Sequence, residues 1–577
     1  MRIHVRYAFV GGTLFLAVIF FKVYLMTWTT VSRDDITSGL NTSDKVIVGN
    51  PLISEYGRND ARLAGELGRG VVLVSEEKTK AEWAMREYRV NVFASDIIPL
   101  NRLVPDSRPP SCKDMKYPYD LPTTSVVIPF HNEWPSILLR TIYSLINRTP
   151  KHILKQVILV DDASDLDTLK SNFDEYVKQH FPKGLVTIIR LPKRSGLIKA
   201  RLRGFELVTS EVVSFFDSHM EVNLHWLEPL LVEIKKNRST IAMAHLDYIK
   251  ADTMQYDFEP GYKTRYGFDW RLIFFETYFR LDQQASKSEV DPLPGVVMVG
   301  PAFAVDVKYF KDIGTYDSGM EIWGGENIEL AWRVWLCGGQ LLHSPCAKVG
   351  HIARAQPYSF PAGRYQTEIH NYKRAVDVWM GPYKKYVYDY FPDMKNMDAG
   401  DISERLKIKS KLKCRTFDWY LKNVWPELFP YAENVFAWGG LENVETKYCL
   451  DNDEYLFQAP VKLIVKPCTF TLWLQGFSWT REFRLRTTLQ CVVVLMEGME
   501  NIPYLQNCIE GPKDTWNHTP DGELRHQKTG LCLQLMAGPM LSMQACDKQK
   551  TSQQWRFKNY TATYRHLINK RQLHRGR

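Results

Sequence analysis

The chain has 577 residues, too many for one hydrophobic core, and this length suggests two or three domains. A composition of 45% hydrophobic and 24% charged residues is typical of globular domains with sizeable cores. The formal net charge of +9 is spread over the whole chain without a long basic run. Such a diluted charge argues little for nucleic acid, and we expect no nucleic acid as partner.

The N-terminus has the pattern of a membrane anchor. Residues 7–21 are almost entirely apolar, and apolar sequence resumes after Lys22 and continues to Trp28. Counted through Trp28, with the Lys22 ammonium reaching toward the membrane surface, this gives about the ~20 residues needed to cross a bilayer. A cleaved signal peptide is the alternative, although no clear small-residue cleavage site follows. Basic residues ahead of the span predict a cytoplasmic tail over 1–6, a signal anchor over 7–28 and a lumenal remainder.

Residues 29–114 predict a lumenal stem. The segment is polar and glycine-containing, and it closes with Pro105, Pro109 and Pro110. Sustained hydrophobic periodicity is missing, so we expect a tether with one helix near Lys80–Val90.

An α/β domain is predicted over 115–435. Thr124–Phe130 is a buried-type strand, residues 136–147 have apolar side chains at helical spacing, and a second apolar strand over 156–160 ends in Asp161 and Asp162. This order is a βαβ unit, whose parallel strands bring their polar carboxyl ends to one edge of the sheet. Ligands bind at that edge in open α/β sheets.

A third apolar strand, Val213–Asp217, is followed at once by Ser218 and His219. Positions i and i+2 of an extended strand share a face, so Asp217 and His219 could both reach one metal ion. A carboxylate with an imidazole suits Mn²⁺ or a similar divalent ion. The plainer alternative is a strand that ends in polar residues and enters a loop.

Cysteine usage favours an oxidising compartment. The chain has ten cysteines and no CxxC spacing, so a disulfide set is a better interpretation than zinc binding. The residues alone leave the connectivity open. Glycosylation sequons, which are compatible with a lumenal chain but also occur by chance, begin at Asn41, Asn147, Asn237, Asn517 and Asn559.

The last domain, predicted over 436–577, has an internal threefold repeat. Its six cysteines fall into three successive pairs, and a Gln-Gly-Phe, a Thr-Trp or a Gln-Gln-Trp sequence follows within each unit. The three units resemble those of a ricin-type lectin β-trefoil, in which Phe477, Trp516 and Trp555 would pack on the threefold axis.

Several short motifs of the α/β domain follow one another in a characteristic order: Phe130-His-Asn-Glu133, Val160-Asp-Asp162, Gly196-Leu-Ile-Lys-Ala-Arg201, Asp217-Ser-His219, His225-Trp-Leu-Glu-Pro229, Tyr316-Asp317, Trp323-Gly-Gly-Glu-Asn-Ile-Glu329 and Val349-Gly-His351. From about residue 80 to 435 the chain resembles the UDP-GalNAc:polypeptide N-acetylgalactosaminyltransferase family, which begins mucin-type O-glycosylation. The resemblance implies a GT-A type nucleotide-sugar transferase domain with a Rossmann-like sheet, followed by the β-trefoil.

The resemblance also implies a set of site residues. Asp217, His219 and His351 would bind Mn²⁺, and Glu326, Trp323 and Arg354 would be the catalytic group, with Glu326 holding sugar hydroxyls rather than acting as a nucleophile. The remaining substrate contacts would be Phe130, His131, Asp162, Arg194, Ser218, Gly300 and Tyr358. The implied disulfides are Cys112–Cys346, Cys337–Cys414, Cys449–Cys468, Cys491–Cys508 and Cys532–Cys546.

What the resemblance implies about activity is transfer of GalNAc from UDP-GalNAc to Ser or Thr hydroxyls of peptides or glycopeptides, with retention of configuration. The chain would be a type II protein of the Golgi membrane, with its catalytic part in the lumen. The alternative is a catalytically weak paralogue that binds glycopeptides or regulates another transferase.

This chain departs from the family pattern in the α/β domain and in the lectin units. Arg194-Ser-Gly-Leu197 stands where Arg-Glu-Gly-Leu is usual, and Val299-Gly-Pro301 stands where Ala-Gly-Gly is usual. Proline has no backbone N–H, so the floor of the sugar pocket is altered. Among the lectin units only the first keeps the sugar-binding aspartate, Asp451, which leaves a working lectin and a structural appendage as alternatives.

Overall fold

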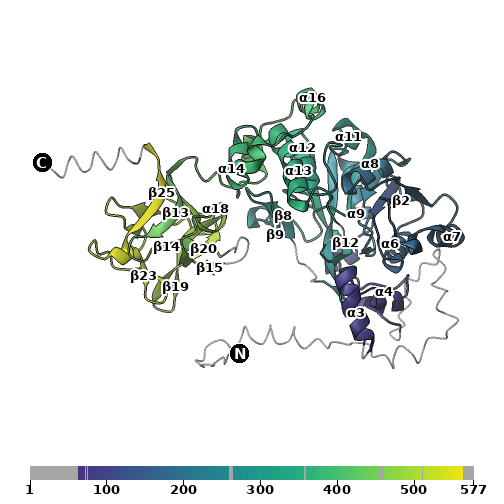
Figure 1. Cartoon of the computed structure of the whole chain (residues 1–577), viewed down its shortest axis with the longest axis horizontal. Helices are drawn as coiled ribbons and strands as arrows, with labels where there is room; N and C mark the ends of the chain where they lie inside the picture. The colour runs from purple at the N-terminus through teal and green to yellow at the C-terminus, as the bar shows by residue number, and fades with distance from the viewer. Residues whose placement is uncertain are drawn as a thin grey trace.

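The computed structural model describes residues 63–71, 73, 76–258, 264–355, 359–453, 460–509, 511–562 and 564. They form two lobes, an α/β domain that includes the N-terminal segment and a β-rich C-terminal domain (Figure 1). No helix among these residues is long and apolar enough to span a bilayer. The predicted anchor over 7–28 and the sequon at Asn41 lie outside the described residues.

A twisted sheet forms the centre of the α/β domain. Its strands run in the order β10-β12-β6-β11-β4-β1-β2-β3, with β5 paired to β12 and β7 paired to β6. Strands β3, β2, β1 and β4 are parallel, as the βαβ pattern predicts, and β11 is antiparallel to its neighbours β4 and β6. The bounds are β1 Thr124–Phe130, β2 Leu154–Asp161, β3 Val186–Arg190, β4 Val212–Phe215, β5 Met220–Val222, β6 Thr240–Lys250, β7 Tyr256–Asp257, β10 Leu293–Pro294, β11 Phe303–Asp306 and β12 Gln340–Ala353.

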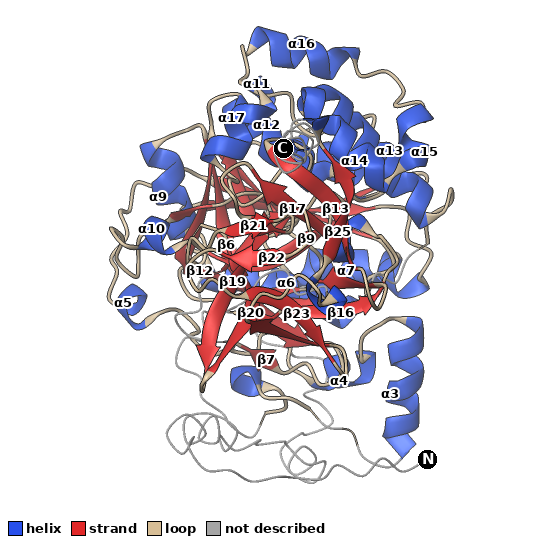
Figure 2. Cartoon of the chain, turned by 90° about the vertical axis from the view of Figure 1, so that its left-hand side faces the viewer, coloured by secondary structure: helices blue, strands red, loops and turns tan. Residues whose placement is uncertain are grey.

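Helices cover both faces of this sheet (Figure 2). A separate hydrophobic core lies under each helix layer. One layer has α6 Pro135–Arg148, α7 Ser171–His180 and α9 Glu228–Lys236. The other has α8 Leu197–Phe205, α11 Val307–Asp312, α12 Glu326–Leu336, α13 Arg364–Trp379, α14 Lys384–Tyr390, α15 Pro392–Asn396 and α17 Phe417–Asn423, and the hairpin β8 Thr264–Phe268 with β9 Phe274–Tyr278 packs on it. Helices α10 Leu281–Gln284 and α16 Ser403–Lys411 lie outside these layers.

The N-terminal segment differs from the expected tether. Helix α3 Glu76–Glu87 matches the one predicted helix, but the segment also forms α4 Val92–Ile97 and α5 Pro110–Lys113 and packs on the sheet domain as a small hydrophobic cluster. A buried ion pair joins Arg102 to Glu221 at 2.6 Å, and a disulfide joins Cys112 to Cys346. Because these contacts involve residues more than a hundred positions apart, local periodicity could not reveal them.

The C-terminal domain has three β units around one core. Phe477, Trp516 and Trp555, one from each unit, are all buried there, as predicted. The strands are β13 Val435–Asn443, β14 Tyr448–Asp451, β15 Val461–Lys462, β16 Ile464–Pro467, β17 Gly476–Thr480, β18 Leu485–Arg486, β19 Gln490–Glu497, β20 Glu500–Asn507, β21 Trp516–His518, β22 Leu524–His526, β23 Cys532–Met536, β24 Met540–Gln544 and β25 Trp555–Tyr560, with a short helix α18 Leu472–Gln475. The structure forms all five disulfides that the resemblance implied.

The two lobes are joined by specific contacts. Leu489 of the C-terminal domain belongs to the hydrophobic core of the α/β domain. The guanidinium of Arg486 lies 3.9 Å from the ring centre of Phe429, and that of Arg271 lies 4.3 Å from the ring centre of Trp473 in α18. The contacts on the C-terminal side thus come from α18 in the first unit and from the segment around β18 that leads into the second.

Candidate active site

A cavity of about 410 Å³ opens where β1, β2 and β4 end. This is the edge of the sheet at which the sequence predicted a ligand site. Every predicted catalytic, substrate-binding and metal-binding residue among the described residues of the α/β domain lines it, namely Phe130, His131, Asp162, Arg194, Asp217, Ser218, His219, Gly300, Trp323, Glu326, His351 and Arg354. Tyr358 lies outside the described residues.

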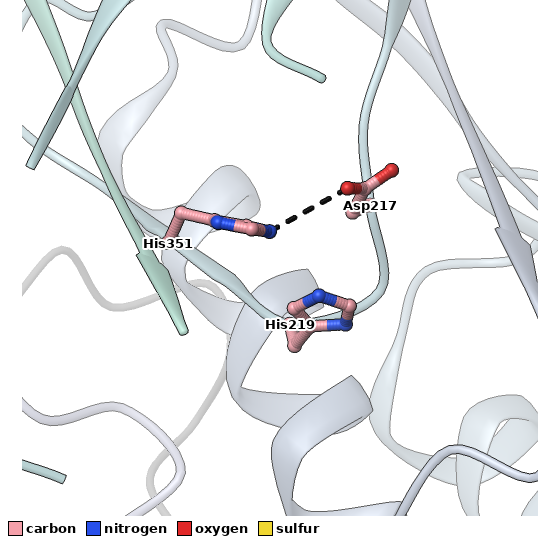
Figure 3. Close-up of side chains that lie close together, drawn as sticks. All are labelled: Asp217, His219 and His351. Atoms are coloured by element: carbon pink, nitrogen blue, oxygen red, sulfur yellow. Dashed lines mark ion pairs between the residues drawn. The ribbon is translucent and has the colours of Figure 1, made fainter. Parts of the chain in front are cut away.

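Asp217, His219 and His351 offer one oxygen and two nitrogens that all lie within 4.8 Å of one another (Figure 3). Strand β5 pairs with β12 so that Met220 is opposite His351, and this register brings His219 beside His351, with ring centres 4.9 Å apart. The expected placement of Asp217 and His219 on one face of a strand is wrong. Strand β4 ends at Phe215, and a bend at Ser218–His219 turns both side chains toward His351.

The charges around Asp217 keep it ionised. Burial alone would raise its pKa, but the His351 ring and the Arg201 guanidinium hold the pKa of this carboxyl well below its usual range. Nε2 of His351 lies 3.5 Å from the Asp217 carboxylate, and Nη2 of Arg201 lies 3.1 Å from it. An ionised oxygen beside two imidazoles is a donor set that fits Mn²⁺.

Glu133 also lines the cavity, although the sequence analysis left it without a role. Its carboxylate is buried and accepts hydrogen bonds from Ser218, His219 and Arg354. Burial would raise its pKa, but the Arg354 charge and the His219 bond lower it to about 2. The signal was its place in the Phe130-His-Asn-Glu133 motif, directly after a strand that ends at the site.

The predicted nucleotide side is held together by Asp162. Its two oxygens accept hydrogen bonds from the backbone N–H groups of Ser195 and Gly196, and it forms an ion pair with Arg194. Nδ1 of His131 lies 2.9 Å from the Asp162 carbonyl oxygen. Burial and the nearby Arg194 charge lower the pKa of His131 to about 4, so its ring is neutral at neutral pH.

On the predicted sugar side, Glu326 begins helix α12 and is 1% exposed. Its Oε2 accepts the Gly324 N–H at 2.9 Å, and burial raises its pKa. Within the described residues, Oε1 of Glu326 and Oδ1 of the adjacent Asn327 have no hydrogen-bond partner although both are buried. Buried acceptors of this kind call for a donor, and the hydroxyls of a bound sugar would supply it.

The altered segment lies against the same group. Val299, Gly300 and Pro301 all line the cavity, and a Cβ atom added to Gly300 would lie 3.3 Å from the Asn327 amide. Trp323 also lines the cavity, and the Arg364 guanidinium lies 5.4 Å from its ring centre.

Asp451 in the C-terminal domain is 1% exposed, and both of its oxygens are used inside its own unit. One accepts the Asp453 N–H at 2.8 Å and the other accepts the Gln475 amide at 3.0 Å. In the third unit Gln534 replaces this aspartate and accepts the equivalent bond from Gln553 at 2.9 Å. The bond therefore persists where the aspartate is lost.

Comparisons with known proteins agree with this architecture. The profile of glycosyl transferase family 2 matches residues 125–313, and the ricin-type β-trefoil lectin domain matches residues 437–567. Human polypeptide N-acetylgalactosaminyltransferase 13 is 39% identical over 86% of this chain and 89% of its own, and human polypeptide N-acetylgalactosaminyltransferase 10 is 35% identical over 89% and 87%. A crystal structure of GalNAc-T7 with UDP, GalNAc and Mn²⁺ superimposes with a TM-score of 0.60 at 32% identity and covers 86% of this chain and 93% of its own.

Proposed function

Because this chain belongs to the polypeptide N-acetylgalactosaminyltransferase family, we propose that it transfers GalNAc from UDP-GalNAc to Ser or Thr hydroxyls of peptides or glycopeptides, in mucin-type O-glycosylation. The observation that carries the proposal is the Asp217, His219 and His351 cluster in the wall of the 410 Å³ cavity. The direct test is UDP-GalNAc turnover by residues 30–577 with Mn²⁺ on a mixed peptide and glycopeptide panel.

In the proposed reaction, separate groups of residues would bind the metal ion and the nucleotide. Asp217, His219 and His351 would hold Mn²⁺, which neutralises the charge that develops on the departing diphosphate. Phe130, His131, Asp162 and Arg194 form the wall for uridine and ribose, next to Ser218. Arg354 lies beside the metal ligands, where its positive charge would face the diphosphate.

Glu326 and Asn327 would hold the sugar. The two unpartnered acceptors described above would bind hydroxyls of the GalNAc ring and fix its orientation beneath the incoming acceptor hydroxyl. Trp323 closes the wall on the leaving-group side. In this arrangement Glu326 orients the sugar and forms no bond to its anomeric carbon.

The altered floor supports the alternative of a slower enzyme. We expect the double change Val299→Ala with Pro301→Gly to raise kcat about tenfold or more and to leave UDP affinity nearly unchanged. The reason is that a missing N–H donor to a buried partner costs about 1–3 kcal/mol, and each 1.36 kcal/mol is tenfold in rate. Initial rates on peptides with and without GalNAc measure the effect.

Pro301→Ala is the matched control, because it restores the N–H and keeps a Cβ atom. A gain in the double variant but none in Pro301→Ala would assign the effect to Val299 or to glycine flexibility. Fast wild-type turnover on bare peptides, unchanged in both variants, would contradict the pocket argument.

We also propose that the chain is a single-pass type II protein of the Golgi membrane with its catalytic part in the lumen. The five disulfides support an oxidising compartment. So does the sequon at Asn237, which is exposed in a turn after α9 with its Oδ1 accepting the Ser239 N–H at 3.0 Å. Protease protection in sealed vesicles tests the topology.

Asn237 gives a second measurement of the compartment. We expect the Asn237→Gln variant, expressed through the secretory pathway, to lose one glycan. The variant should migrate faster than the wild type on a gel, and glycosidase treatment should abolish the part of this difference that Asn237 causes. Asn147→Gln should change nothing, because the Asn147 Oδ1 is buried and the hydroxyl of Thr149, in the same sequon, accepts a bond from Trp226. A protein with no glycan at Asn237 in the Golgi would contradict the expectation.

For the C-terminal domain we propose a structural contribution from Asp451, supported by the internal use of both its oxygens. Binding of GalNAc glycopeptides that is lost in Asp451→Asn would favour the lectin alternative.

A further inference from the structure

One buried carboxylate lies behind the metal ligands without belonging to them. Glu133 is 2% exposed, and its Oε2 accepts three hydrogen bonds: from Nδ1 of His219 at 2.8 Å, the Ser218 hydroxyl at 2.8 Å and Nη2 of Arg354 at 2.6 Å. Its Oε1 accepts the backbone N–H of Trp134 at 3.0 Å. Both oxygens are therefore directed at protein groups.

The first consequence concerns His219. Its Nδ1 lies 2.8 Å from the Glu133 carboxylate, which can only accept, and 3.3 Å from Nη2 of Arg354, which can only donate. The shorter contact places the His219 proton on Nδ1, and Nε2 keeps the lone pair that a metal requires. The Ser218 bond to the same oxygen fixes the bend that carries His219 out of the sheet. Glu133 thus sets both the tautomer and the ring orientation of one ligand.

The second consequence concerns Arg354. Its Nη2 is bound by Glu133, and its Nη1 donates to the Tyr88 carbonyl of the N-terminal segment at 3.2 Å. The Tyr88 ring packs on Trp134, with centres 5.0 Å apart. Nε of Arg354 is buried and has no partner among the described residues. The guanidinium is therefore fixed by hydrogen bonds from two of its three nitrogens.

We infer that Glu133 is a positioning residue that orients His219 toward the metal and Arg354 toward the diphosphate, with the Tyr88 carbonyl as its second anchor. This inference rests on the proposed function. It makes the N-terminal segment part of the support of the site, since Tyr88 follows α3 directly.

The test is Mn²⁺ affinity of residues 30–577, measured by the electron paramagnetic resonance signal of free Mn²⁺ without nucleotide. Glu133→Gln keeps the shape but presents an amide, which cannot replace the charge on the shared oxygen. We expect a Kd for Mn²⁺ about 10–100-fold weaker, the usual effect of losing a group that orients a metal ligand. At saturating Mn²⁺, UDP should also bind more weakly because Arg354 is released.

Glu329→Gln is the matched control. Glu329 is equally buried and is paired with Arg333 and Trp379, but it does not line the cavity, so its loss should lower thermal stability without changing the Kd for Mn²⁺. Glu133→Asp retains the charge one methylene farther away and should bind Mn²⁺ with intermediate affinity. It replaces Glu133→Gln if that variant does not fold.

Equal Mn²⁺ affinity in the wild type and the Glu133 variants would overturn the inference and leave the proposed function intact. A loss of transfer with unchanged Mn²⁺ and UDP affinities would also overturn it, since positioning acts through binding. Failure of the wild type to bind Mn²⁺ would remove the metal centre and the inference together.

Discussion

Replacing Asp217 with asparagine is expected to reduce transfer by about three orders of magnitude. The carboxylate is the anionic member of the cluster, and its loss removes several kcal/mol of charge stabilisation on the leaving diphosphate, at 1.36 kcal/mol per decade. Mn²⁺-dependent UDP binding should weaken in parallel. Turnover and UDP titration with and without Mn²⁺ measure both effects.

The Asp217→Asn variant should remain folded, because Arg201 also contacts Tyr316 and the side chain keeps its volume. Asp161→Asn is the matched control. Asp161 is a buried carboxylate at the end of β2 that pairs with Arg190, and it does not line the cavity. Metal-dependent UDP binding that survives Asp217→Asn, His219→Ala and His351→Ala singly would contradict the assignment of the metal site.

Replacing Glu326 with glutamine is expected to lower kcat/KM by about 10–100-fold with little change in UDP affinity. An ionised acceptor that binds a sugar hydroxyl contributes about 1.5–3 kcal/mol, and that contribution should fall on the sugar rather than on the nucleotide. The measurement is steady-state kinetics together with UDP titration.

The same Glu326→Gln variant should be more stable than the wild type at neutral pH. Burial raises the folded-state pKa of Glu326, so the stability that its neutral form contributes is present below the unfolded pKa and is lost as pH rises through the folded pKa. Glutamine resembles the neutral form at every pH. The gain in melting temperature should therefore vanish in acid. Equal loss of stability at both pH values would contradict this role.

Local patterns were sufficient for much of the fold. Apolar runs predicted β1, β2 and the helix between them to within a few residues. The reason is that the burial of each element is reflected in the spacing of its own apolar residues. The trefoil core residues were predictable because the repeat is visible in the chain itself.

What could not be predicted depends on distant contacts. The bend at Ser218–His219 is set by Glu133 and by the pairing of the adjoining β5 with β12, and both Glu133 and β12 are far from the bend in sequence. The docking of the N-terminal segment depends on the ion pair between Arg102 and the distant Glu221. Arg201, next to Asp217 in space, lies inside α8, where a helical arginine is usually a surface residue.

The register of β12 also governs when the site can exist during synthesis. His351 lies near the end of a strand that pairs with β6 and β5. Cys112 can form its disulfide only after Cys346, 234 residues later, has been synthesised. A nascent chain that ends before β12 holds two of the three metal ligands and lacks the strand that aligns them. Such non-local pairing makes folding slow, and it ties metal binding to the completion of the central sheet.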